Sequence, residues 1–174
     1  MSENKTGNAR PSWTRRDAIL MSAETILFIV QVVLCFLFYN WAGLNLLLYL
    51  GWIVLVIAMF LCWRARVAFE TRGQSPEKES WLRTTAVVDN GVYAVIRHPM
   101  YLAFMLIFFA LACISQHWLS VILGAIGALM IYNDMRREEK GNVAKFGEDY
   151  LRYMHQVPRM NFVLGIVRLM QRRK

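Results

Sequence analysis

The sequence predicts an all-α integral membrane protein that crosses the bilayer four times and ends in short interfacial helices. Apolar side chains make up 57% of its 174 residues, which is too large a share for an ordinary soluble domain. Residues 44–63 carry no charge and are long enough to cross a hydrocarbon core of ~30 Å as a helix. The Lys and Arg residues cluster beside the apolar runs, as they do in proteins that follow the positive-inside rule.

The N-terminal part is expected to form a helical hairpin. Residues 1–12 are polar and predict a flexible tail, and residues 13–66 hold a first helix, roughly residues 17–39, followed by the span at 44–63. Because the connection is short, the second helix returns antiparallel to the first. Glu24 lies in the first helix. It is either an immersed functional carboxylate or, in the interpretation that we favour, a group at the level of the lipid headgroups.

The remaining residues, 67–174, are predicted to complete a single membrane domain over residues 1–174. A polar stretch extends to Arg97, and Asn90-Gly91 within it is compatible with a tight turn and a small β-hairpin over residues 87–93. Residues 100–114 and 118–132 predict a helical hairpin, although each helix would span only ~22 Å. The helical pattern then continues through charged residues to position 140. Two short helices are expected after it, an amphipathic one at 143–153 and an interfacial one at 162–170 with a basic end.

The distribution of basic residues predicts that both termini are cytoplasmic and that the protein lies in the cell membrane. Basic residues precede the first helix, separate the second from the third and follow the fourth, whereas the connections near Asn40 and Gln116 carry none. This topology places Arg97-His98-Pro99 and Glu138-Glu139 at the same cytoplasmic rim. It also argues against nucleic-acid binding, because the basic residues do not form a soluble basic face.

The junction at Pro99 is the first candidate for a binding site. Proline fixes φ near the helical value and lacks an N–H group, so Pro99 suits the first position of a helix. The free N–H groups of that first turn, together with the helix dipole, make an anion site near Arg97 and His98. The alternative is that these basic residues are a topology signal or contact lipid headgroups. No disulfide or metal site is predicted from the three cysteines, which lie singly in apolar runs.

Several blocks of residues in the second half occur in a characteristic order. They are Gly91-Val92-Tyr93, Arg97-His98-Pro99-Met100-Tyr101, Glu138-Glu139, Phe146-Gly147, Tyr150, Tyr153 and Val157-Pro158. With these blocks, roughly residues 82–160 resemble the isoprenylcysteine carboxyl methyltransferase family, and the related membrane phospholipid methyltransferases share much of the pattern. The resemblance implies an enzyme with a cytoplasmic cofactor pocket that acts on a lipophilic or prenylated substrate among membrane lipids.

The resemblance also implies that the cofactor is S-adenosylmethionine. The family's cofactor contacts, carried over by position, fall on Thr85, Ala86, Val87, Val88, Tyr93, His98, Pro99, Met100, Tyr101, Glu138 and Glu139. The helix that starts at Pro99, with His98, would suit the carboxylate of the cofactor, and Glu138 would accept from its ammonium or ribose groups. One departure is Thr85, where the carboxyl methyltransferases commonly have histidine.

The predicted catalytic residues are Arg97, Arg136, Arg137 and Glu138. The leading expectation is methylation of an isoprenylcysteine-like carboxylate, which is already ionised at neutral pH and needs an arginine to position it. The alternative acceptor is the amine of a phospholipid, which must lose a proton and therefore needs Glu138 or Glu139 as a base. A further alternative, from another class, is a non-catalytic membrane protein whose basic rim binds anionic lipid or a partner protein.

Overall fold

The computed structural model describes residues 15–72 and 87–172. Its elements are α1 (Arg15–Leu37), α2 (Asn45–Arg72), the 3-10 helix η1 (Gly91–Ala94), α3 (Pro99–Ser115), α4 (Trp118–Phe146), α5 (Glu148–Gln156) and α6 (Phe162–Arg172). Within these ranges the chain contains helices and turns but no strand, which confirms the all-α class. The predicted tail at residues 1–12 lies outside the described residues.

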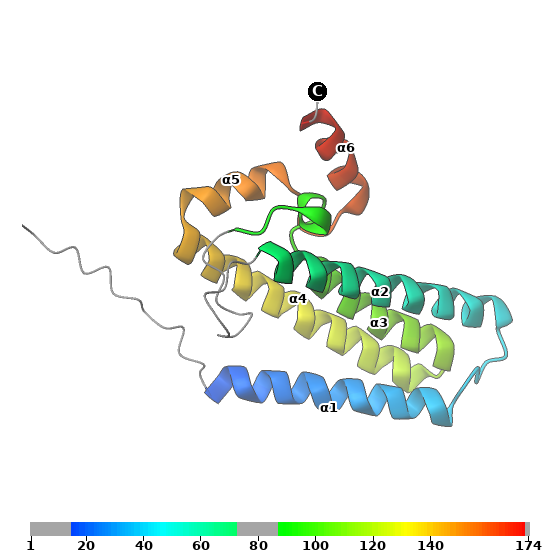
Figure 1. Cartoon of the computed structure of the whole chain (residues 1–174). Coiled ribbons are helices and arrows are strands. Elements are labelled where there is room, and N and C mark those ends of the chain that lie inside the picture. Colours follow the sequence, from blue (N-terminus) through cyan, green and yellow to red (C-terminus); the bar gives the residue numbers. More distant parts are fainter. Residues whose placement is uncertain (1–14, 73–86, 173–174) are drawn as a thin grey trace, which may run out of the picture.

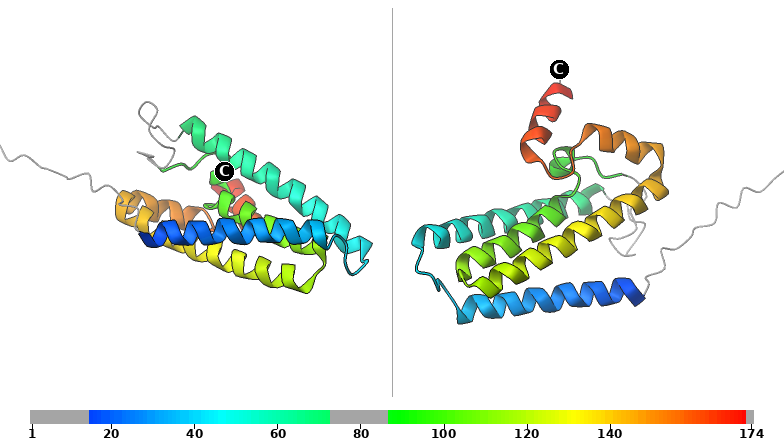
Figure 2. Two further views of the ribbon diagram at one scale, coloured as in Figure 1. Left: turned by 90° about the horizontal axis from the view of Figure 1, so that it is seen from below. Right: turned by 180° about the vertical axis from the view of Figure 1, so that it is seen from behind.

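Helices α1 to α4 form a bundle in which successive helices run in opposite directions (Figure 1). The third helix, α3, packs against both α2 and α4, and α1 packs against α3 and α4. The start of α3 and the end of α4 therefore lie at the same end of the bundle (Figure 1). Helix α5 follows at that end, and Figures 1 and 2 show α6 running crosswise to the bundle axis.

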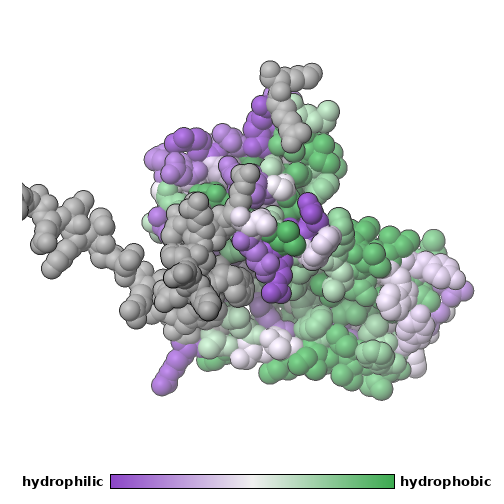
Figure 3. Space-filling view, viewed as in Figure 1, coloured by the Kyte–Doolittle hydropathy of each residue, from purple (hydrophilic) through white to green (hydrophobic). Residues whose placement is uncertain are grey.

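Three helices of the described chain are long and apolar enough to span a membrane: Ala18–Leu37, Asn45–Thr71 and Trp118–Phe146. Apolar residues cover much of the bundle surface, whereas hydrophilic residues gather around α5 (Figure 3). Phe36 and Leu46, for example, are 82% and 85% exposed, which suits side chains that face lipid. Helix α3 is apolar but has only 17 residues, so the fourth crossing stays a prediction.

The predicted β-hairpin at residues 87–93 is wrong. Gly91 adopts a φ of +56° there, but it opens the 3-10 helix η1 instead of joining two strands. The reason is tertiary packing, because Val88 and Tyr93 are buried against Ala65 and Ala68 of α2. The segment thus packs on a helix and does not pair with itself.

The helix predicted at 143–153 is divided between two elements. Helix α4 continues unbroken to Phe146, and Gly147, with a φ of +55°, separates it from α5. A residue with a side chain is strained in this left-handed region, so glycine is the residue that allows the chain to turn there. The predicted C-terminal helix forms, and it extends to Arg172.

Small residues bring α4 close to its neighbours. A Cβ atom added at Gly127 would lie 2.5 Å from Cε1 of Phe108, and one added at Gly124 would lie 2.8 Å from Nε2 of Gln31. Gln31 is fully buried and donates to the backbone oxygens of Phe108 and Ser120 at 2.9 and 3.1 Å. These contacts bring α4 close to α1 and α3, and they tie α1 to the α3–α4 hairpin.

Candidate active site

The segment before α3 is held by the chain that follows α5. Pro99 is the first residue of α3, as the sequence predicted, and His98 precedes it with φ −124° and ψ 60°. The backbone N–H of Arg97 donates to Pro158 O at 3.0 Å, and that of His98 donates to Arg159 O at 3.2 Å. A stretch far away in the sequence therefore fixes the backbone of the junction.

A buried carboxylate, Glu139 of α4, joins the junction to this stretch. Its Oε1 accepts from Arg97 Nη2 at 2.8 Å and lies 3.2 Å from His98 Nε2, while its Oε2 accepts from Arg159 Nη2 at 2.6 Å. Glu139, Arg97 and His98 are 5%, 8% and 3% exposed. Because an unpaired charge is costly at such burial, each partner is needed to keep the others in place.

Arg97 is engaged by further contacts within the protein. Its Nη1 donates to the backbone oxygens of Met154 and Val157, both at 2.7 Å. Together with the bond to Glu139, these contacts occupy both terminal nitrogens of the guanidinium group. Arg97 therefore holds the end of α5 and the residues before α3 in position.

Glu138, one residue earlier on α4, faces a different environment. Its side chain is exposed, its Oε2 accepts a hydrogen bond from the Tyr101 hydroxyl, and Asn142 Nδ2 donates to its Oε1 at 3.4 Å. The rings of Tyr101 and His98 meet edge to face with their centroids 5.6 Å apart. Glu138 is thus an accessible carboxylate beside the start of α3.

Two buried tyrosines secure η1 against α5. The hydroxyl of Tyr153 donates to the backbone oxygen of Tyr93 at 2.7 Å. Burial raises the pKa of the Tyr153 hydroxyl, and burial followed by the charge of Glu138 raises the pKa of the Tyr93 hydroxyl. Both groups therefore stay neutral at physiological pH, and Tyr153 remains a hydrogen-bond donor.

The structure brings some of the predicted residues together and separates others. At the end of the bundle where α3 starts, five of them form one polar group: Arg97, His98, Tyr101, Glu138 and Glu139. Arg136 is exposed on α4 and Arg137 pairs with Asp134 at 3.3 Å, so neither joins this group.

The other predicted cofactor contacts are mostly part of the packing. Val88 and Tyr93 belong to a buried cluster on α2, and Met100 packs against it. Val87 packs against the cluster formed by Tyr150, Tyr153 and Val157, and Pro99 is buried. Thr85 and Ala86 lie outside the described residues.

Arg159 and Asn142 are site residues that sequence reasoning did not identify. Arg159 approaches the junction only through the tertiary fold, since 20 residues separate it from Glu139. Its position after Val157-Pro158, at the end of the characteristic blocks, was the signal available for it. Asn142 follows Glu138 by four residues, a spacing that places the two side chains on one face of a helix.

The residues present fit a polar, zwitterionic ligand such as S-adenosylmethionine. Two buried polar atoms at the junction have no partner among the described residues, Arg97 Nε and Arg159 Nε. The first turn of α3 adds backbone N–H groups, and Glu138 adds an accessible acceptor. Over residues 15–72 and 87–172 no group of side chains suits a metal ion.

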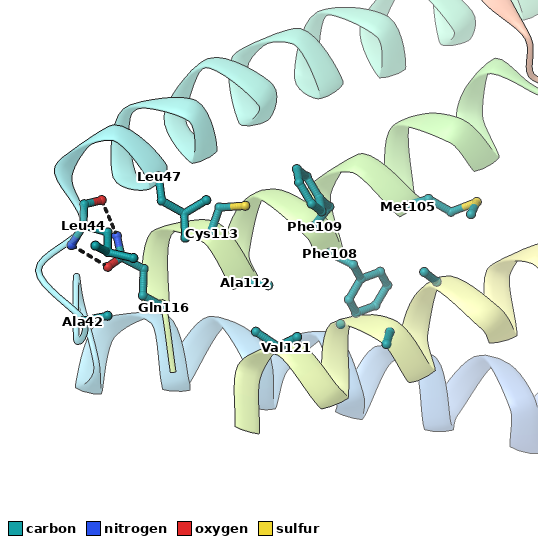
Figure 4. Close-up of a pocket in the computed structure, with 13 residues that line it drawn as sticks. Ala42, Leu44, Leu47, Met105, Phe108, Phe109, Ala112, Cys113, Gln116 and Val121 are labelled. Atoms are coloured by element: carbon teal, nitrogen blue, oxygen red, sulfur yellow. Dashed lines mark hydrogen bonds between the residues drawn. The ribbon is translucent and has the colours of Figure 1, made fainter. Parts of the chain in front are cut away.

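An apolar groove runs along α3 away from this group (Figure 4). Its volume is about 340 Å³, and Met105, Phe109 and Ala112 of α3 line it together with Val121 and Ala125 of α4. Met105 follows Tyr101 by one helical turn, but none of Arg97, His98, Tyr101, Glu138 and Glu139 lines the groove itself. At its far end Gln116 bonds to the backbone of Leu44, accepting at 3.0 Å and donating at 2.9 Å.

The family model described as phospholipid methyltransferase matches residues 38–148, which is more than half of the chain. The chain belongs to the phospholipid methyltransferase family. This membership confirms the predicted resemblance to the membrane methyltransferases and, at the level of the family, the expectation of an enzyme. The five residues that meet at the start of α3, Arg97, His98, Tyr101, Glu138 and Glu139, all lie inside the matched range, and Arg159 lies beyond it.

Two curated relatives of this family member are named methanethiol S-methyltransferase. The protein of Crocosphaera subtropica is 23% identical over 177 positions, covering 88% of this chain and 66% of the relative. The protein of Pseudomonas deceptionensis is 31% identical over 121 positions, covering 67% of this chain and 44% of the relative. This chain therefore spans less than two thirds of the length of either relative. No solved structure matches it.

Proposed function

We propose that this chain is an integral-membrane enzyme that transfers a methyl group from S-adenosylmethionine to a lipophilic acceptor at the cytoplasmic rim. The observation that carries the proposal is the Tyr101–Glu138 pair beside His98 at the start of α3, with the apolar groove beginning at Met105, about one helical turn further along the same helix. In this proposal a polar ligand reaches the exposed Glu138 from water, and an apolar ligand approaches along α3 from the groove. The family membership supplies the type of reaction.

The cofactor would be held by residues around the junction. The N–H groups at the start of α3 would receive its carboxylate, and Glu138 would accept from its ammonium or hydroxyl groups. When bound, the cofactor supplies an electrophilic methyl group. The residues of the chain align the acceptor with that group and exclude water, and such proximity contributes several kcal/mol to catalysis.

The contacts of Arg97 bear on the nature of the acceptor. Methylation of an isoprenylcysteine-like carboxylate would need a free cation, but Arg97 is committed to Glu139 and to two backbone oxygens. Arg137 pairs with Asp134, and Arg136 is exposed on α4 away from the residues that meet at the start of α3. The geometry therefore favours an acceptor that carries a proton, an apolar thiol or a phospholipid amine, over a carboxylate. The methanethiol S-methyltransferases among the relatives make the thiol the first candidate.

A thiol or an amine must lose a proton as it accepts the methyl group. The thiol of cysteine has a pKa of about 8.5 and an alkanethiol is no more acidic, so at neutral pH most of a thiol acceptor is protonated. Glu138 is the accessible carboxylate of the polar group and would take that proton, while Tyr101 orients its side chain. Because the site uses α3, α4 and the chain after α5, residues 67–174 form the catalytic half in this proposal.

The test begins with binding to the purified full chain in detergent. Isothermal titration with S-adenosylmethionine should give heat, and the ligand should raise the unfolding temperature. No heat together with no thermal protection would contradict the proposal. Tyr101→Phe should weaken binding, whereas Glu148→Gln, an exposed carboxylate on α5, is the matched control.

The acceptor is then identified with a radiolabelled methyl donor. The panel consists of an alkanethiol, phosphatidylethanolamine and an isoprenylcysteine analogue. We expect label in the thiol or the amine, and Glu138→Gln should abolish this transfer while the protein stays folded. Label in the carboxylate, with the transfer retained in Glu138→Gln, would restore the carboxylate expectation.

A further inference from the structure

Helix α6 is anchored to the protein through its polar side. A Cβ atom added at Gly165 would lie 2.0 Å from Val95 O, so the helix backbone packs directly on the segment before the site. Arg172 Nη2 donates to Ala94 O at 3.0 Å, and Arg168 Nη1 donates to His155 O at 3.1 Å. The charged side chains that would normally face water are thus turned toward backbone oxygens of the protein.

The opposite side of α6 is apolar and uncovered. Val163, Ile166, Val167 and Met170 are 74%, 41%, 45% and 63% exposed. Their spacing of three, one and three residues places them on one stripe of a helix. Within the described chain this stripe has no covering element. Exposure of such a stripe to water is unfavourable at about 25 cal/mol per Å² of apolar surface.

The orientation of α6 relative to the bundle indicates that lipid covers its apolar stripe. Figures 1 and 2 show that α6 runs crosswise to the bundle, whose axis crosses the membrane. Figure 3 shows that the hydrophobic side of α6 is turned the same way as the hydrophobic flank of the bundle, whereas the hydrophilic side is turned toward α5. The apolar stripe of α6 therefore faces in the same direction as the lipid-facing surface of the bundle.

We propose that α6 is an amphipathic helix that lies in the boundary between headgroups and acyl chains, in the leaflet next to the active site. In this position the bilayer holds α6, and α6 holds Ala94 and Val95, which precede Arg97 and His98 by four residues or fewer. The membrane, through α6, therefore helps to hold the residues before α3 in position. An in-plane helix with an apolar face and basic residues is the usual form of such an anchor.

The test uses the full chain in lipid nanodiscs with a fluorophore on a single cysteine. The native cysteines at 35, 62 and 113 are replaced by alanine, and a variant that still unfolds cooperatively is used as the background. Val163→Cys places the label on the apolar stripe, and Gln156→Cys, exposed at the end of α5, is the matched control. Lipids brominated near the top of the acyl chain should quench the first label strongly and the second weakly.

A second measurement examines the support of the site. Val163→Asp should expel the stripe from the lipid and weaken binding of S-adenosylmethionine in nanodiscs about fivefold or more, while Gln156→Asp leaves the affinity unchanged. Equal quenching of both labels would overturn the proposal. So would crosslinking of Val163→Cys to a second copy that persists on dilution with lipid, because the stripe would then be a subunit interface. Quenching does not depend on methyl transfer, so its failure is distinct from failure of the proposed function.

Discussion

Arg159 Nη2 lies 2.6 Å from Glu139 Oε2, and this ion pair joins the chain after α5 to the last turns of α4. Arg97 takes the other oxygen of the same carboxylate, so one acidic side chain holds two basic ones from different parts of the sequence. Hydrogen bonding to Glu139 raises the pKa of the Arg159 guanidinium, which keeps its positive charge.

Replacing Arg159 should weaken the contact between the chain after α5 and helix α4. Arg159→Ala leaves one oxygen of the buried Glu139 without its partner, and we expect a loss of about 1–3 kcal/mol of folding free energy. Arg152→Ala is the control, because Arg152 also pairs with an acidic residue, Asp149, at 3.3 Å, but both side chains are largely exposed. The control should cost less than about 1 kcal/mol. Thermal unfolding in detergent measures both, and equal losses would contradict the role given to Arg159.

The adjacent acidic residues Glu138 and Glu139 should respond differently to the same substitution. Glu139→Gln removes the charge that Arg97 and Arg159 share, and breaking such a buried arrangement costs about 3–5 kcal/mol. Glu138→Gln affects an exposed group and should change stability by no more than about 0.5 kcal/mol. It should instead abolish transfer to a thiol or amine. Unfolding temperature and transfer of labelled methyl, measured on both variants, separate a positioning residue from a catalytic one.

The hydrogen bond from Tyr153 to Tyr93 O should make stability depend on alkaline pH. Because burial raises the folded-state pKa of Tyr153 above its unfolded value of ~10, the stabilisation is complete below pH ~10 and is lost as the pH rises through the folded-state pKa. Tyr153→Phe leaves a buried backbone oxygen without a donor and should cost about 1–3 kcal/mol at neutral pH. The stability of this variant should also fall less steeply above pH ~10.

Urea unfolding across the alkaline range measures the difference between wild type and Tyr153→Phe. Tyr93 is buried too and contributes a decline of its own, so the informative quantity is the change in slope between the two proteins. Parallel declines would show that the Tyr153 hydroxyl does not titrate with unfolding.

The local features of the site could be predicted from the sequence, because they depend on neighbours along the chain. Pro99 starts α3 through its fixed φ, and the helical hairpin brings His98 to the end of α4, where it lies 3.2 Å from Glu139. The roles within the acidic pair could not be predicted. Successive residues of a helix point about 100° apart, and only the packing of α4 against α3 decides that Glu139 is buried and Glu138 exposed.

The difference between local and long-range contacts also explains which predictions were wrong. Asn90-Gly91 carries a strong turn signal, but the burial of Val88 and Tyr93 on α2 decides that a 3-10 helix forms after the turn and not a second strand. Arg97 looked like a free cation because its partners at Met154, Val157 and Glu139 are 42 to 60 residues away. Contacts at such separation leave no periodic trace in a single sequence.

The two glycines at the contact between α4 and its neighbours give the last prediction. Gly127→Ala would place a Cβ atom 2.5 Å from Cε1 of Phe108, and Phe108 is itself 3% exposed and has little space to move. Overpacking of this kind costs about 1–3 kcal/mol. Gly141→Ala is the matched control on the same helix, because a Cβ atom there meets nothing within 4 Å. Since alanine is the better helix former, the control should stabilise α4 by up to about 1 kcal/mol. Thermal unfolding in one detergent should therefore shift in opposite directions for the two variants, and a shift in the same direction would contradict the close packing of α4 on α3.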